Sequence, residues 1–129
     1  MPVPAAVTHQ PRLLSLNIHD EPGITFGELA PGITLWPLFI DPANATWVMY
    51  ARYEPGVQLA RHFHTGVVHF FTVKGRWGYA EHPLDEQRAG SYLFEPANSL
   101  HTFTIPADAT EAVEGFMVVT GANVNFDAD

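Results

Sequence analysis

The chain of 129 residues contains no cysteine. Disulfide bonds and thiolate metal sites are therefore excluded, and histidine and carboxylate side chains are the ligands left for a transition metal. Basic residues are also few, because 6 lysines and arginines stand against 14 aspartates and glutamates, giving a formal charge of -8. A basic surface for phosphate backbones is lacking, so we do not expect the chain to bind nucleic acid.

Long hydrophobic runs are missing as well. No segment is apolar for long enough to span a bilayer, and the first residues lack the basic and apolar parts of a signal peptide. We therefore expect no membrane association and a cytoplasmic location. The length suits one domain, and the 47% of hydrophobic residues are enough to form a folded core. We divide the chain into an N-terminal arm, residues 1–20, and one folded domain, residues 21–129.

Short apolar segments alternate with turn residues along the chain. The 11 prolines and 10 glycines are spread between them and leave no window long enough for a stable helix. The segments are rich in β-branched and aromatic residues, as β-strands are. They cover residues 32–40, 45–53, 67–73, 77–80, 91–94, 101–105 and 113–120. Many short strands with frequent turns predict an all-β sandwich or barrel with little helix.

Two histidines, His62 and His64, are separated by one residue. Side chains two residues apart on a β-strand point to the same face, so both imidazoles are expected in one site. A third histidine, His101, follows a turn at residues 97–99 and begins a later strand. Three imidazoles are a typical ligand set for a transition metal and leave coordination positions open. The sequence therefore predicts a metal site at His62, His64 and His101.

Two motifs surround these histidines, and both resemble the motifs of the cupin superfamily. The matching positions are Gly56, His62, His64 and Gly75 in the first motif, and Gly90, Pro96 and His101 in the second. The resemblance implies that residues 21–129 form a single-domain cupin, a jelly-roll-type β-barrel. Cupins usually carry a glutamate where this chain has His69. His69 is then either a fourth metal ligand or, as we interpret it, a neighbour that orients the site.

Within the cupins, the chain resembles dioxygenases that cleave carbon–carbon bonds in β-diketones and aryl hydroxyketones, such as acetylacetone and dihydroxyacetophenone. The segments that carry this resemblance are residues 37–42, 62–66, 74–77, 90–96 and 121–126. It implies a non-haem Fe(II) held by the three histidines, with a small-molecule substrate and O2 as the reactants. Three neutral imidazoles leave the ion dipositive, so that a hydroxyketone could chelate it through two oxygens.

Two further polar residues receive catalytic roles from this resemblance. Glu95, six residues before His101, is expected to accept the substrate proton or to hold a water, although it could also be a carboxylate that caps the following turn. His69 is expected to donate a hydrogen bond to a bound oxygen. The aromatic side chains expected to wall the substrate pocket are Phe71, Tyr92 and Phe103.

Other functions share the same sequence pattern. Mn, Ni or Zn in the site would suit a cupin isomerase, lyase or hydrolase, because histidine-rich sites accept several metals. A metal-bound cupin that senses a ligand without catalysis is a third interpretation. Exposed sheet edges and an N-terminal arm commonly pair between subunits, so we expect a homodimer or a homotetramer.

Overall fold

The computed structural model describes residues 13–126, in which ten β-strands and two single-turn 3-10 helices form. The strands are β1 (Ile24–Thr25), β2 (Ile33–Asp41), β3 (Thr46–Tyr53), β4 (His62–His64), β5 (Val68–Lys74), β6 (Gly78–Tyr79), β7 (Tyr92–Glu95), β8 (Phe103–Thr104), β9 (Val113–Thr120) and β10 (Asn123–Asn125), and the helices are η2 (Gly27–Leu29) and η3 (Pro42–Asn44). The prediction of an all-β fold with little helix is confirmed. Of the expected arm, residues 1–12 lie outside the described residues, and residues 13–20 contain no strand or helix.

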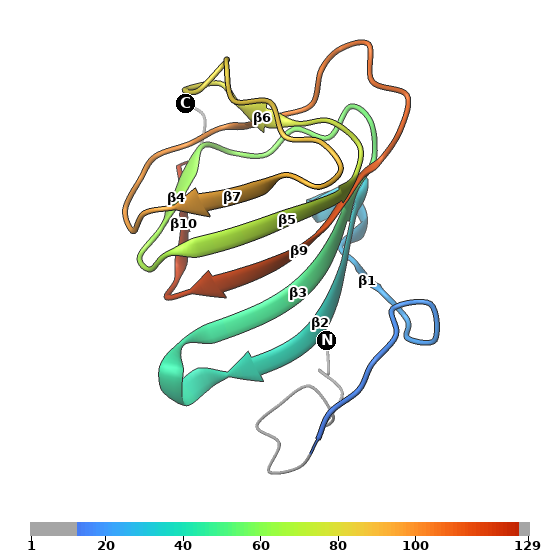
Figure 1. Ribbon diagram of the computed structural model, residues 1–129, viewed down its shortest axis with the longest axis vertical. Coiled ribbons are helices and arrows are strands. Elements are labelled where there is room, and N and C mark those ends of the chain that lie inside the picture. Colours follow the sequence, from blue (N-terminus) through green and yellow to red (C-terminus); the bar gives the residue numbers. More distant parts are fainter. Residues whose placement is uncertain (1–12, 127–129) are drawn as a thin grey trace.

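The strands form one large sheet and two small ones. Six strands pair in the order β1-β2-β3-β9-β5-β7, and the remaining four form the pairs β10-β4 and β6-β8. Every pairing is antiparallel. Figure 1 shows the large sheet strongly curved, with β4 and β10 running across the direction of its strands at one end. Within residues 13–126, neither helix is long and apolar enough to cross a membrane.

The hydrophobic core fills the concave side of the large sheet. Its fully buried members include Trp77, which is 1% exposed, and Val113, which is 0% exposed. The indole Nε1–H of Trp77 donates to Oγ1 of the buried Thr72 at 2.9 Å, so that the only polar group of the tryptophan is satisfied inside the core. Alternation along β5 turns Val68, Phe70 and Thr72 toward this core.

Close packing of β9 against β5 requires a glycine. A Cβ atom at Gly115 would lie 2.4 Å from the carbonyl oxygen of Phe71 and 2.5 Å from the ring of Phe70. The backbone oxygen belongs to a paired strand and has no room to move away. The glycine therefore allows the Phe70 ring to lie against the sheet and to face Trp77, at a centroid distance of 5.0 Å.

We expect Gly115→Ala to lower the free energy of unfolding by about 1–3 kcal/mol, because the added methyl overpacks the β5–β9 contact. Gly78→Ala is the matched control, since the nearest atom to its Cβ would be 3.7 Å away, an ordinary contact distance. Chemical denaturation of both variants measures the difference. Equal stability of the two variants would contradict the packing argument.

Candidate metal centre

The strand β4 brings His62 and His64 to the cavity inside the barrel. Both side chains line that cavity, as the period of two along the strand predicts. The neighbouring strand β10 places Asn125 opposite His62 and Asn123 opposite His64, and these two asparagines line the cavity as well. One wall of the cavity thus carries two imidazoles and two carboxamides on adjacent strands.

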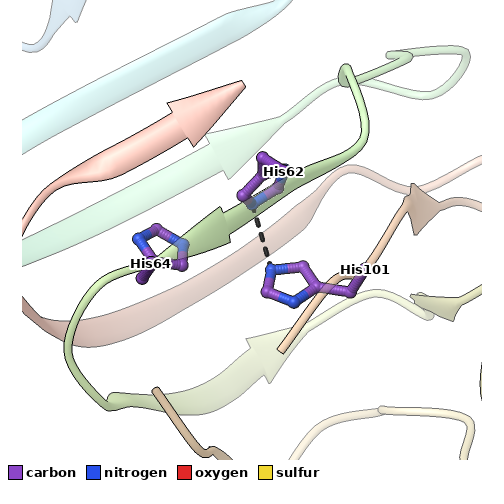
Figure 2. A group of neighbouring side chains, drawn as sticks. All are labelled: His62, His64 and His101. Carbon is purple, nitrogen blue, oxygen red and sulfur yellow. Dashed lines mark hydrogen bonds between the residues drawn. The ribbon is translucent and has the colours of Figure 1, made fainter. Parts of the chain in front are cut away.

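His101 reaches the same place through backbone pairing with His62. The N–H of each residue donates to the carbonyl oxygen of the other at 3.0 Å, which joins β4 to the segment before β8. The two Nε2 atoms are 3.1 Å apart. Each of His62, His64 and His101 offers a nitrogen, and these nitrogens all lie within 4.8 Å of one another. Figure 2 shows the three rings converging from β4 and from the adjoining segment.

The hydrogen bonds around the imidazoles suit metal binding. His62 Nδ1 lies 2.8 Å from the carbonyl oxygen of Ala60, which fixes the proton on Nδ1 and leaves the Nε2 lone pair directed at His101. Nδ1 of His64 is buried and has no hydrogen-bond partner within residues 13–126. Because imidazole lone pairs converge here and a buried ring nitrogen is left unpaired, the residues present fit a transition-metal ion such as Fe(II).

Burial keeps two of the rings neutral. It lowers the pKa of His64 to about 4, and the neighbouring His62 contributes to the same shift. Burial also lowers the pKa of His101 to about 4, with His62 and His64 as further causes. Neutral imidazole is the form that binds metals, so these two ligands need not lose a proton near pH 7.

Glu95 lies beside the third histidine, at the end of β7. Its side chain is 6% exposed, and its Oε2 is 3.2 Å from Nε2 of His101 without making a hydrogen bond. Its Oε1 accepts a hydrogen bond from the hydroxyl of Tyr79, whose ring stacks on His101 at a centroid distance of 4.3 Å. Burial raises the pKa of Glu95 to about 8. The carboxyl group can therefore gain and lose a proton close to neutral pH.

The cavity in front of these groups has a volume of about 690 Å³. Its walls are mostly apolar, and among residues 13–126 no lysine or arginine lines it. Polar groups gather at the histidines, namely His62, His64, Tyr79, Glu95, Asn123 and Asn125. Phe103 is buried and forms part of the wall, where the sequence predicted an aromatic side chain. The site is an apolar chamber with one polar end.

Three predicted site residues lie elsewhere. His69, Phe71 and Tyr92 project from the convex face of the large sheet, on the side opposite to the cavity, and none of them lines it. Nδ1 of His69 is 2.7 Å from the hydroxyl of Tyr92, and the two rings stack. The expectation that His69 joins or orients the three histidines is therefore corrected, as is the expectation that Phe71 and Tyr92 wall the pocket. The inward positions of β5 belong to Val68, Phe70 and Thr72.

Sequence reasoning missed three polar neighbours of the histidines. Asn123 and Asn125 could have been predicted to share one face of a strand, because one residue separates them, as one residue separates His62 and His64. No spacing in the sequence relates Tyr79 to the histidines. It reaches Glu95 because β6 pairs with β8 and so lies beside the segment that carries His101.

Comparisons with known proteins agree on the fold. The profile of the ChrR cupin-like domain family matches residues 17–123. A protein of unknown function with a cupin-like fold from Ralstonia eutropha JMP134 is 41% identical, with a TM-score of 0.85 over 95% of this chain and 76% of that chain. None of the curated proteins matches the chain.

Two more distant structures bear on the fold alone. An acetylacetone dioxygenase from Acinetobacter johnsonii is 22% identical, with a TM-score of 0.74 over 92% of this chain and 80% of that chain. The structure of Rhodobacter sphaeroides SigE in complex with the anti-sigma factor ChrR contains a chain that is 14% identical, with a TM-score of 0.62 over 80% of this chain and 50% of that chain. Neither identity is high enough to carry a function across.

We expect His64→Ala to lose most of the Fe(II) that the wild-type protein retains after anaerobic loading and desalting, because a three-ligand site then has only two imidazoles. His69→Ala is the matched control, since this histidine is on the opposite face of the sheet. Elemental analysis of metal per chain measures both variants. Equal metal loss in the two variants would contradict the placement of the site.

Proposed function

The chain belongs to the ChrR family of cupin-like domains, and we propose that it is a non-haem Fe(II) dioxygenase. The proposed reaction cleaves a carbon–carbon bond of an aryl hydroxyketone or a related dicarbonyl with O2. One observation carries this proposal: three imidazoles converge beside a buried carboxyl group of raised pKa, Glu95, and two of them, those of His62 and His64, line the polar end of one apolar cavity together with Glu95.

The residues that would hold the iron are His62, His64 and His101. A ferrous ion bound there would supply Lewis acidity toward the substrate oxygens and the electrons that activate dioxygen. Inserting both oxygen atoms across the bond between the carbonyl and the carbinol carbon converts a 2-hydroxyketone into two carboxylic acids. The remaining tasks are to orient the substrate, to remove its proton and to exclude water, and the chain's own residues perform them.

Glu95 is the group that we assign to proton transfer. A base works best when its pKa is near the working pH, and burial brings Glu95 to about 8. The hydrogen bond from Tyr79 to Oε1 fixes the carboxyl plane and leaves Oε2 facing His101. A substrate hydroxyl bound next to His101 would then meet an acceptor oxygen that has no other hydrogen bond.

The cavity wall selects neutral substrates. No lysine or arginine of the described residues lines the chamber, so these residues offer no counter-ion for a carboxylate or phosphate, and burying an unpaired charge is costly. Apolar side chains such as Leu35, Phe70 and Phe103 suit an aromatic ring. These features support a neutral ketone with one aromatic or alkyl end and two chelating oxygens.

We expect the Fe(II)-loaded protein to consume oxygen when an aryl hydroxyketone or a β-diketone is added, and His101→Ala to abolish this uptake. An oxygen electrode follows the reaction, and chromatography of the products shows which bond breaks, since a 2-hydroxyketone would give two carboxylic acids and a β-diketone one carboxylic acid and one 2-oxoaldehyde. An analogue that carries a carboxylate on its ring is the substrate control and should be a much poorer substrate. Turnover without oxygen uptake, in the Mn, Ni or Zn form, would instead favour an isomerase or hydrolase.

We expect Glu95→Gln to lower kcat by roughly 10²–10⁴-fold, the usual contribution of a general base, while the protein keeps its iron. Glutamine preserves the shape and the acceptor oxygen for Tyr79 but cannot take up a proton. Comparing kcat with metal content separates a catalytic defect from loss of the site. Wild-type kcat in the iron-loaded variant would remove Glu95 from the reaction.

A ligand-sensing role is the second candidate, and the match to the ChrR cupin-like domain favours it. The same cavity would then bind a neutral ligand without converting it. The two functions are separated by mixing the iron-loaded protein with a bound ketone under oxygen. A sensor would return the ketone unchanged, whereas the proposed enzyme would consume oxygen and release the cleavage products.

A further inference from the structure

The hydroxyl group of Tyr53 is buried in the domain without a hydrogen-bond partner. The other tyrosines all have a hydroxyl that is hydrogen-bonded to a side chain, namely Tyr50, Tyr79 and Tyr92. The hydroxyl of Tyr53 bonds to no residue within 13–126, although Tyr53 is only 8% exposed. A buried tyrosine hydroxyl normally has a partner, so a group that is absent from the chain itself is expected to supply one.

The oxygen of this hydroxyl can be reached from the cavity. In the described part of the chain, the unpaired side-chain atoms that are fully enclosed belong to His64, Gln87 and Glu95. Tyr53 is not one of these residues, although its hydroxyl is unpaired, so its oxygen borders open space. Tyr53 also lines the cavity of about 690 Å³. A molecule that satisfies this hydroxyl therefore occupies the cavity.

Tyr53 belongs to the apolar part of the cavity wall. It ends strand β3, which runs between β2 and β9 in the curved sheet (Figure 1). Its neighbours across the two pairings are Ile33 on β2 and Val113 on β9. Its ring packs against the buried ring of Phe103 at a centroid distance of 4.8 Å. The hydroxyl is thus a polar group among apolar side chains, and it is carried by a different strand from the three histidines.

Packing holds the ring of Tyr53 in place. Phe103, which it contacts, stacks in turn on Trp77 at a centroid distance of 5.1 Å, and Trp77 is 1% exposed. The backbone of Tyr53 is paired on both sides, with β2 and with β9. A hydroxyl that is fixed beforehand loses little conformational entropy when it binds a ligand. The geometry is that of a preformed recognition group.

The hydroxyl keeps its proton at neutral pH. Burial raises the pKa of Tyr53, and the negative charge of Glu95 raises it further. Tyr53 is therefore a hydrogen-bond donor, and its natural partner is an oxygen atom with a free lone pair. Glu95 lines the same cavity. A ligand that fills the cavity would contact the carboxyl group and the tyrosine hydroxyl at two different points.

We propose that Tyr53 determines ligand specificity by donating a hydrogen bond to a neutral oxygen of the ligand, other than the two oxygens that would chelate the metal. The inference rests on the proposed binding of a neutral ketone in this cavity, and it applies to an enzyme and to a sensor alike. An ether, carbonyl or hydroxyl oxygen at this point satisfies the tyrosine. A hydrocarbon group at the same point leaves a buried donor unpaired, which is costly.

Two probes of the same shape, anisole and ethylbenzene, test this role of Tyr53. They differ only in an ether oxygen that replaces a methylene group, and neither can chelate a metal, so the result does not depend on iron or O2. NMR titration measures the dissociation constant of each probe for the wild-type protein, with its metal as purified, and for Tyr53→Phe. We expect Tyr53→Phe to weaken anisole binding by roughly 3–10-fold, the effect of one neutral hydrogen bond, and not to weaken ethylbenzene binding.

Tyr92→Phe is the matched control, because it removes a hydroxyl that is bonded to His69 outside the cavity and should change the affinity of neither probe. Chemical denaturation should show that Tyr53→Phe keeps the wild-type free energy of unfolding, since the lost hydroxyl has no partner in the protein.

Equal weakening of both probes by Tyr53→Phe, unchanged anisole binding, or a large loss of stability would overturn the role of Tyr53. Failure of both probes to bind the wild-type protein would overturn it as well. If the probes behave as expected but no ketone triggers oxygen uptake, the dioxygenase is wrong and the role of Tyr53 in ligand recognition stands.

Discussion

The paired backbone hydrogen bonds between His62 and His101 are the contact on which the site depends. They join two segments that are far apart in sequence, and they bring the Nε2 atoms of the two imidazoles to 3.1 Å from each other. The other edge of β4 pairs with β10, so the short strand is held on both sides. A strand of three residues would be marginal alone. Between two partners it presents His62 and His64 at fixed positions, as a preformed metal site requires.

The strands and the three histidines were predictable because their signals are local. Turn residues mark the ends of the strands, and the period of two assigns His62 and His64 to one face wherever the strand lies. The position of His69 could not be predicted in this way. Along β5 both alternating sets contain one uncharged polar residue among apolar or aromatic ones, with Thr72 beside Val68 and Phe70 on one face, and His69 beside Phe71 and Val73 on the other. Alternation then shows that two faces exist but does not show which of them is buried.

The polar end of the cavity depends on contacts between distant segments, and sequence spacing does not reveal them. Glu95 is at the end of β7, Tyr79 is on β6, and His101 precedes β8. The three meet because β6 pairs with β8 while the segment before β8 pairs with β4. In the part of the chain that the structure describes, the carboxyl group of Glu95 accepts a hydrogen bond from Tyr79 at one oxygen and from no donor at the other. Its raised pKa follows from this incomplete solvation and not from its place in a motif.

The two faces of β5 are similar in hydrophobicity, and this similarity has a physical meaning. A sheet with one face in water normally carries polar side chains there, whereas β9, β5 and β7 carry aromatic rings on the face away from the cavity. Apolar and aromatic side chains on both faces made the position of His69 unpredictable, and they are typical of a sheet that is covered on both sides. The same strands carry Val68, Phe70 and Glu95 on the cavity side.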